Sequence, residues 1–350
     1  MSNLILDLEK RNLIKPPKWL TTSIQYLAIT GSVAYGVSTD NSDMDCYGFC
    51  IPKKEDIFHH LAGEIPGFGT QKKRFEQYIQ HHIEDKDKKC NYDLTIMNIV
   101  KYFNLLLGCN PNVIDVIYSP HDCILHITQV GQLVRENRNI FLTKKAYHTH
   151  SGYSYSSINK MSNRNKRLEK IKKLEVSLGF EVNLKFIEQE LDNRKDKDFF
   201  SEYELINEIS DAELYEFKDI LSSNRNQKII AEGQQFDLKF SMHAVRLLFQ
   251  VEQILEEGDL DLRRNSELYK SIRRGDLTEK EIRQIISEKE VILKRLYETS
   301  KLPFSANESK IKDLLLKCLE IHYGSLDKCV ERVDKYQVAF DRIKEIVDNV

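Results

Sequence analysis

The sequence has few of the features that mark secreted, zinc-binding or membrane proteins. Its seven cysteines are an odd number and include no C-x-x-C pair, which argues against both a disulfide framework and a zinc ribbon. No apolar run is long enough to cross a bilayer, and the N-terminal residues are too charged for a signal peptide. The sequence therefore predicts a protein of the reducing cytoplasm that has no membrane partner.

An excess of charge of one sign is also missing. The 350 residues include 52 lysines and arginines and 54 aspartates and glutamates, so the formal net charge is −2. Without a global basic charge, any binding of nucleic acid must come from a local patch. The length predicts two domains, and helical periodicity takes over completely near residues 120–125. We expect an α+β domain over residues 1–125 and an all-helical domain over residues 126–350.

The most distinctive part of the chain is a pair of predicted strands with aspartates on the second. The first strand covers Tyr26–Ile29, and the second covers Asp43–Ile51. Side chains two residues apart on a strand share a face, so Asp43 and Asp45 would present adjacent carboxylates. Such carboxylates repel each other unless a hard cation lies between them, and Mg²⁺ binds carboxylates together with substrate phosphates.

The connection between these strands offers a place for a phosphate group. Gly31 permits close approach of the backbone, and a short helix over Val33–Gly36 after Ser32 would direct free N–H groups at an anion. Each feature alone has an ordinary explanation, because Gly-Ser pairs occur in many turns and D-x-D occurs on many exposed strands. Their combination in this order predicts a site for a nucleoside triphosphate.

The same residues resemble a known signature. G-S-x-A-Y-G followed by S-D-x-D-x-x-G is similar to the motif of the DNA polymerase beta superfamily of nucleotidyltransferases. Within it, the chain is most similar to the RNA repair pathway branch of bacteria and phages, whose members are associated with RNA ligases. The matching residues are Gly31, Ser32, Ala34, Tyr35, Gly36, Ser42, Asp43, Asp45 and Gly48. The resemblance implies a polymerase-beta-like core of a small mixed sheet with helices, followed by a helical domain. It also implies an RNA ligase of the same pathway as a partner, and nucleotide contacts from Gly31, Ser32, Tyr35, Gly36 and Ser42.

The superfamily places a third acid on a later strand, and Asp93 fits that position. It lies in a short strand predicted over Cys90–Leu94, ahead of a helix predicted over Thr95–Leu107 and an N-P-N turn at 110–112. Two-metal phosphoryl transfer normally uses three carboxylates. An alternative is that Asp93 only caps the following helix, and Asp115 is a weaker rival for the third acid. The catalytic and metal-binding residues that the resemblance implies are Asp43, Asp45 and Asp93.

The helical half contains more residues that the resemblance connects with the nucleotide. Tyr153 lies in a segment similar to G-Y-x-x-x-Q, although Ser157 stands where Gln is usual. His243 and Arg246 lie in a segment similar to H-x-x-R-L-L, and an arginine there would offer a forked donor to phosphate oxygens. A buried structural pair that joins helices explains the last two residues equally well.

The most basic run of the chain is Lys160–Lys173. It contains seven lysines and arginines and a single acidic residue, Glu169. Such a run can neutralise phosphates, so we expect it to bind RNA, with Lys160 near the nucleotide, and the affinity to fall steeply with salt. A solvated helix face is the commoner explanation for a run of charge.

These features predict a metal-dependent nucleotidyltransferase. With two Mg²⁺ ions, or Mn²⁺ in their place, it would move a nucleoside monophosphate from a nucleoside triphosphate to a hydroxyl group, which we expect at an RNA 3′ end. Two other interpretations remain open. The acceptor could be a protein side chain or a small molecule, or the chain could be a catalytically silent RNA-binding module. The motifs carry no information on oligomeric state.

Overall fold

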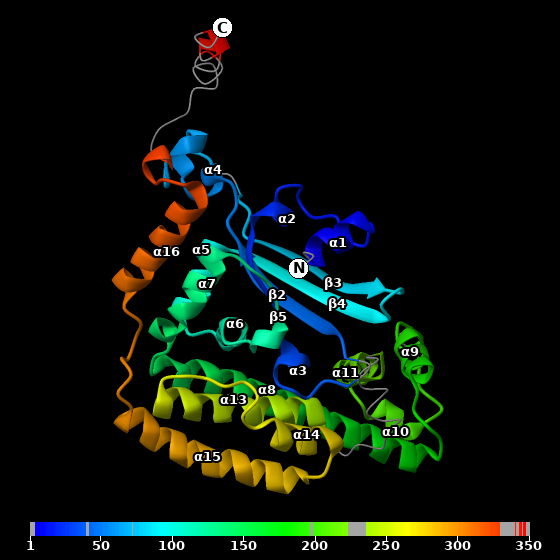
Figure 1. Ribbon diagram of the computed structural model, residues 1–350. Helices are drawn as coiled ribbons and strands as arrows, with labels where there is room; N and C mark the ends of the chain where they lie inside the picture. Colours follow the sequence, from blue (N-terminus) through cyan, green and yellow to red (C-terminus); the bar gives the residue numbers. More distant parts are fainter. Residues whose placement is uncertain are drawn as a thin grey trace. The chain divides into compact units, whose positions relative to one another are not determined.

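Figure 1 shows the computed structural model, which describes residues 4–39, 42–71, 73–196, 199–222, 236–329, 340, 343–344 and 346–347. The chain divides into two compact units. Unit 1 comprises Met1–Thr149, Gln250–Ser266 and Arg295–Val350, and unit 2 comprises His150–Phe249 and Glu267–Lys294. Three segments distant in sequence therefore form unit 1. The functional division predicted at residue 125 stays a prediction.

Unit 1 is built on a five-stranded mixed sheet with the order β3-β4-β2-β1-β5. Strands β2 and β4 pair in parallel, and the other neighbouring strands are antiparallel. The strands are β1 (Ile24–Ile29), β2 (Met44–Cys50), β3 (Gln77–Asp85), β4 (Cys90–Asn98) and β5 (Ile124–Ile127). Strand β1, between β2 and β5, is buried along its whole length, as expected for an apolar run covered on both faces.

The start of the helix after β4 was predicted wrongly. The sequence pattern places it at Thr95, but β4 continues to Asn98 and α5 covers Ile99–Leu107. Residues 95–97 are buried and continue the parallel ladder with β2, whose last pair joins Cys50 and Asn98. A short apolar run fits both the helical and the strand periodicity, and here the pairing with β2 makes residues 95–97 a strand. The Asn98 side chain then caps α5 by accepting from the Lys101 amide.

Helices α5 and α7 (Gln129–Glu136) pack against the sheet, and α16 (Glu308–Tyr323) packs against both helices. Helix α16 contacts both α5 and α7, and buries Ile311, Leu314, Cys318 and Leu319. The remaining short elements of unit 1 are α2 (Leu20–Ser23), α3 (Gly31–Ala34), α4 (Lys54–Ile57), η1 (His59–Ala62), α6 (Pro111–Ile117), η2 (His121–Cys123), η3 (Arg138–Phe141) and η4 (Asp327–Cys329).

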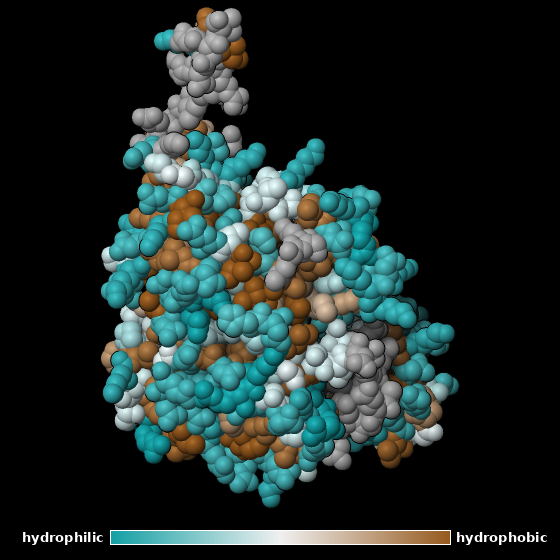
Figure 2. Space-filling view, viewed as in Figure 1, coloured by the Kyte–Doolittle hydropathy of each residue, from teal (hydrophilic) through white to brown (hydrophobic). Residues whose placement is uncertain are grey.

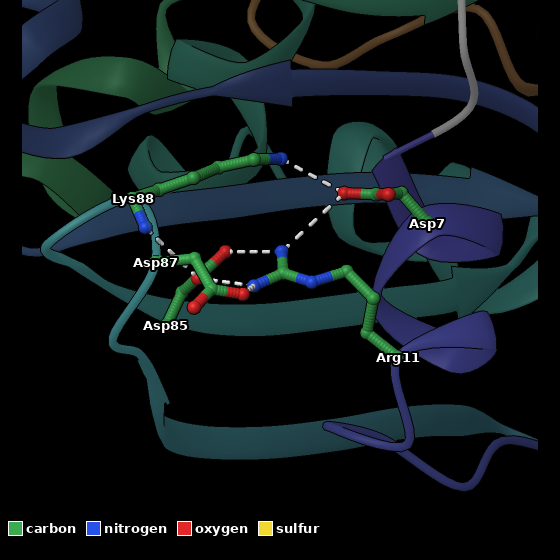
Figure 3. A network of polar contacts seen from close by, with 5 residues as sticks. All are labelled: Asp7, Arg11, Asp85, Asp87 and Lys88. Carbon is green, nitrogen blue, oxygen red and sulfur yellow. Dashed lines mark hydrogen bonds and ion pairs between the residues drawn. The ribbon is translucent and has the colours of Figure 1, made fainter.

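An ionic network fastens the N-terminal helix α1 (Leu4–Lys10) to the β3–β4 hairpin (Figure 3). Arg11 donates from Nη1 to Asp85 Oδ2 at 2.6 Å and from Nη2 to Asp87 Oδ2 at 2.8 Å. Lys88 donates from Nζ to Asp7 at 2.8 Å. The Asp85 carboxylate is fully buried, and its two oxygens receive the Arg11 fork, a strong geometry for an ion pair. The hairpin that carries Asp93 is thus held at its turn.

All regular elements described in unit 2 are helices. It includes most of α8 (Lys145–Leu178), α9 (Leu184–Asn193), α10 (Glu204–Asn207), α11 (Asp211–Ser222), part of α13 (Leu238–Glu257), most of α14 (Ser266–Arg274) and part of α15 (Glu279–Thr299). Apolar residues of α8, α9 and α11 form one core cluster, with Ile171, Ile187 and Leu214 among its most buried members.

Hydrophilic side chains cover most of the face seen in Figure 2, as expected for a chain in which 30% of the residues are charged. In the part of the chain that the structure describes, no helix combines the length and the apolar character needed to cross a membrane.

Candidate active site

Asp45 and Asp93 occupy paired positions on adjacent strands. In the parallel ladder between β2 and β4, the Cα of Asp45 pairs with the Cα of Asp93. Neighbouring strands lie about 4.8 Å apart, and paired residues direct their side chains to the same face. The strand pairing therefore brings together two of the three predicted carboxylates. Asp45 and Asp93 are both partly buried, whereas Asp43, one residue before β2, is exposed.

Gly31 lies against the Asp45 carboxylate. A Cβ atom built on Gly31 would lie 2.1 Å from Asp45 Oδ2, and the residue has a φ of +62°, which L side chains rarely adopt. The preceding residue is also tied to β2, since the Thr30 amide donates to the Asp45 carbonyl at 2.7 Å. Only glycine fits at this position without moving the carboxylate.

A β-bulge in β3 holds Asp93. The pairing of β3 with β4 shifts between Gln80 and Ile83, which leaves His81 and His82 opposite Asp93. The His82 amide donates to Asp93 Oδ1 at 2.7 Å, and His81 Nδ1 lies 3.5 Å from Asp93 Oδ2. His82 reaches this position with a φ of +55°. Sequence reasoning missed both histidines as site residues, because nothing in the strand pattern marks the bulge.

The alternative role of Asp93 as a helix cap is wrong. Asp93 lies within β4, and Asn98 caps α5. Asp115, the rival third acid, is buried in α6, accepts from the Tyr35 hydroxyl at 2.5 Å and accepts from Gln250 at 2.9 Å. Both of these donors belong to unit 1, so the Asp115 carboxylate has a structural role there.

The predicted phosphate loop is a single helical turn, α3, followed by a tight bend. Tyr35 is buried, with its hydroxyl on Asp115, so the nucleotide contact predicted for it stays a prediction. Gly36 has a φ of +69°, and a Cβ there would lie 3.5 Å from Ser266 Cβ. The partly buried Ser32 accepts from the Val37 amide through its carbonyl at 2.9 Å. Ser42 closes the connection to β2, where its hydroxyl accepts from the Thr39 amide at 2.9 Å.

The donor chemistry fits a divalent cation, but the residues do not form a closed cluster. Asp45 and Asp93 offer hard oxygen ligands of the kind that Mg²⁺ prefers, and the missing Cβ of Gly31 keeps the backbone close to one of them. Among the described residues, no three His, Cys, Asp or Glu side chains are gathered closely enough to hold a metal ion. The three-carboxylate site stays a prediction.

The profile of one protein family covers most of the sequence. It is described as the RNA repair pathway DNA polymerase beta family, and it matches residues 9–295. The chain belongs to this family. Membership confirms the resemblance seen in the signature, and together with the mixed sheet it confirms the expected α+β fold class with a nucleotidyltransferase-like core.

Two further proteins are similar to this member of the RNA repair pathway DNA polymerase beta family. An uncharacterized 38.9 kDa protein from the nrdC-mobD intergenic region of Enterobacteria phage T4 is 25% identical over 115 residues. The match covers 32% of this chain and 31% of the phage protein, so the chain spans about a third of that relative's length. The crystal structure of a nucleotidyltransferase-like protein from Exiguobacterium sibiricum 255-15 aligns with 84% of this chain and 73% of its own, at 11% identity and a TM-score of 0.24.

Four predicted nucleotide contacts of this family member lie in unit 2. Tyr153 on α8 is 44% exposed. On α13, His243 is partly buried and Arg246 is buried. Lys160 belongs to α8, but its side chain lies outside the described residues. The nucleotide-binding roles of all four residues stay predictions.

Acidic residues of α11 contact part of the basic run. Arg167 lies 3.0 Å from Glu216, and Lys170 forms an ion pair with Glu213. The Lys170 ammonium holds the pKa of the Glu213 carboxyl below its ordinary value. Lys172 and Lys173 are exposed. Part of the run therefore joins α8 to α11, which fits the structural interpretation for Arg167 and Lys170.

Proposed function

We propose that this protein transfers a nucleoside monophosphate from a nucleoside triphosphate to a hydroxyl group, and that the acceptor is an RNA 3′ end. The observation that carries the proposal is the pairing of Asp45 with Asp93, with the backbone of Gly31 against the Asp45 carboxylate. Family membership supports both the type of reaction and its place in RNA repair.

Each group of residues has a defined task in this proposal. Asp43, Asp45 and Asp93 would hold two Mg²⁺ ions, or Mn²⁺ in their place. When bound, such ions lower the pKa of the attacking hydroxyl and neutralise the leaving diphosphate. Gly31 and Ser32 would contact the phosphates, and the His82 amide would keep Asp93 in one orientation. The protein thus contributes placement and charge neutralisation rather than a covalent intermediate.

The unit 2 residues would serve the nucleotide and the acceptor. We propose Tyr153, Lys160, His243 and Arg246 as nucleotide contacts, and the exposed lysines of the run Lys160–Lys173 as contacts to RNA phosphates. Their contribution should weaken with added salt. An RNA ligase of the same pathway is the proposed partner that would use the repaired end.

The test uses purified protein, Mg²⁺ and each of four α-labelled nucleoside triphosphates. Three acceptors are compared: a single-stranded RNA with a free 3′-hydroxyl, the same RNA with a blocked 3′ end, and a cell extract freed of nucleic acid. Label in the open RNA only is the expected result. If label appears in proteins or small molecules of the extract instead, the acceptor is one of these and not RNA.

Asp45→Asn is the decisive variant. It should lower the transfer rate about 1,000-fold or more, because losing a metal ligand removes several kcal/mol of transition-state stabilisation. Asp313→Asn, at an exposed position of α16, is the matched control and should leave the rate unchanged. Equal transfer by both variants would contradict the proposal, and RNA binding without transfer by any form would favour the silent binding module.

A further inference from the structure

Arg263 contacts the phosphate loop from a distant part of the sequence. It belongs to the segment Gln250–Ser266 of unit 1, more than 200 residues after α3. Its Nε donates to the Ala34 carbonyl at 3.3 Å, and its Nη2 donates to the Val33 carbonyl at 3.5 Å. The last carbonyl groups of a helix have no partner in its own ladder, and the guanidinium supplies a donor to the Ala34 carbonyl. The Val33 carbonyl accepts from the guanidinium as a second donor, because it also accepts from the Gly36 amide at 3.1 Å.

The same guanidinium contacts the connection that leads into β5. Arg263 Nη1 donates to Asp122 Oδ2 at 2.9 Å, and Nη2 lies 3.4 Å from Cys123 Sγ. Strand β5 begins beside the end of β1, since Ala28 pairs with Ile124. Arg263 therefore joins two connections at one end of the sheet, one of which is the phosphate loop.

Backbone packing adds to this attachment. The tight bend at Gly36 faces the same segment, because a Cβ on Gly36 would lie 3.5 Å from Ser266 Cβ and 3.8 Å from Arg263 Cγ. The Arg263 side chain keeps 37% of its surface exposed, but most of its donors already have partners in unit 1. The Arg263 guanidinium thus binds α3 and Asp122.

We infer that Arg263 is a positioning residue for nucleotidyl transfer. It holds α3 so that Gly31, the first residue of this helix, keeps its place beside the Asp45 carboxylate. This inference rests on the proposed function for its effect on catalysis, but the effect on the loop is independent of any activity. Lysine cannot replace the planar fork, because a single ammonium cannot reach the carbonyls and Asp122 together.

The experiment compares Arg263→Ala, Arg263→Lys and the neighbouring control Arg264→Ala in the full chain. Within the described residues, Arg264 pairs with Glu257 and not with α3, so it is a control of the same charge at the neighbouring position. Backbone amide exchange is followed for Tyr35, Gly36 and Val37, whose amides donate to Gly31, Val33 and Ser32. Kinetic constants are measured with a labelled nucleoside triphosphate and RNA, and thermal unfolding is recorded alongside.

Arg263→Ala should speed exchange at these three amides and raise KM for the triphosphate about tenfold, with a smaller fall in kcat. Arg263→Lys should give exchange rates and a KM between those of Arg263→Ala and the unsubstituted protein. For Arg264→Ala, the exchange rates and KM should stay within about twofold of the unsubstituted protein. If Arg263→Ala does not fold, Arg263→Lys is judged by the same measurements. Unchanged exchange and KM, with or without lower thermal stability, would overturn the inference. If no form transfers nucleotide, the proposed function fails, and the exchange data still decide whether Arg263 holds the loop.

Discussion

Asp45 and Asp93 are register partners in the parallel ladder between β2 and β4. The ladder runs without a shift from the pair Met44–Tyr92 to the pair Cys50–Asn98. A slip of one residue would turn one carboxylate to the opposite face of the sheet. The relation between the two side chains is therefore as well fixed as the sheet itself, and the surrounding loops decide what the pair can bind.

Gly31→Ala should disrupt the site more than an equivalent change elsewhere. The new Cβ would meet Asp45 Oδ2 and push the carboxylate aside, so we expect kcat/KM for nucleotidyl transfer to fall about 100-fold. Gly67→Ala is the matched control, since Gly67 also has a positive φ but nothing lies within 4 Å of a Cβ there. Steady-state kinetics on both variants measure the difference. Equal activity would show that Gly31 does not set the position of Asp45.

His82 should tolerate glycine better than a β-branched residue. Its φ of +55° suits glycine, and His82→Gly keeps the amide that donates to Asp93. His82→Val should lower the free energy of unfolding by about 1–3 kcal/mol because valine is strained there. His81→Val, the same change at a neighbouring residue without a positive φ, is the control. Urea denaturation measures all three variants, and similar losses for both valine variants would argue against the bulge.

The Arg11–Asp85 pair should make the stability of the protein depend on acid pH. The hydrogen bonds from Arg11 lower the pKa of Asp85 from 3.8 to about 2. A carboxyl with a lowered folded-state pKa stabilises the fold above its unfolded pKa, and this stabilisation is lost as the pH falls through the folded value. Unfolding midpoints should therefore decrease between about pH 4 and pH 2.

Asp85→Asn isolates this contribution. It should lower the unfolding midpoint at pH 7 and flatten the decrease between about pH 4 and pH 2. The neighbouring Asp87 carboxylate is 83% exposed and accepts one bond from Arg11, so Asp87→Asn should change both properties little. Circular dichroism melts over this pH range provide the measurement. Identical pH profiles for Asp85→Asn and the unsubstituted protein would contradict the assignment.

Tyr35→Phe should affect stability more than nucleotide affinity. Asp115 would lose the donor at 2.5 Å, and one of its buried oxygens would lack that partner, at a cost of about 1–3 kcal/mol in the free energy of unfolding. The control is Tyr118→Phe, which removes a hydroxyl that donates to Asn139 at 2.7 Å outside the loop. Denaturation and KM are measured together. A large rise in KM for Tyr35→Phe alone would show that the hydroxyl also reaches the nucleotide.

Strong local patterns allowed much of the site to be predicted from the sequence. The strand around Asp45, the turn at Gly31 and the strand around Asp93 were all expected, since alternation and glycine placement act over a few residues. The family resemblance is now confirmed. It was this resemblance that predicted Asp93 as a third acid beside Asp43 and Asp45. The role of each acid in binding metal stays a prediction.

Features that depend on tertiary pairing were not predictable in this way. The last residues of β4 were assigned to a helix because the parallel partner strand is invisible in a local pattern. The short strand β5 was not expected, and its pairing with β1 is also long-range. The bulge at His81 and the contact of Arg263 with α3 depend on which segments meet in the fold.

The position of α16 in the sequence has a consequence for biosynthesis. This helix covers α5 and α7, yet it begins about 170 residues after α7 ends. A ribosome adding roughly 5–20 residues per second needs about 10–35 seconds to make that length. During this time, the apolar surfaces of α5 and α7 that α16 covers in the folded protein are exposed. A chaperone that shields α5 and α7 during this interval should raise the yield of native protein, and premature termination before α16 should yield aggregates.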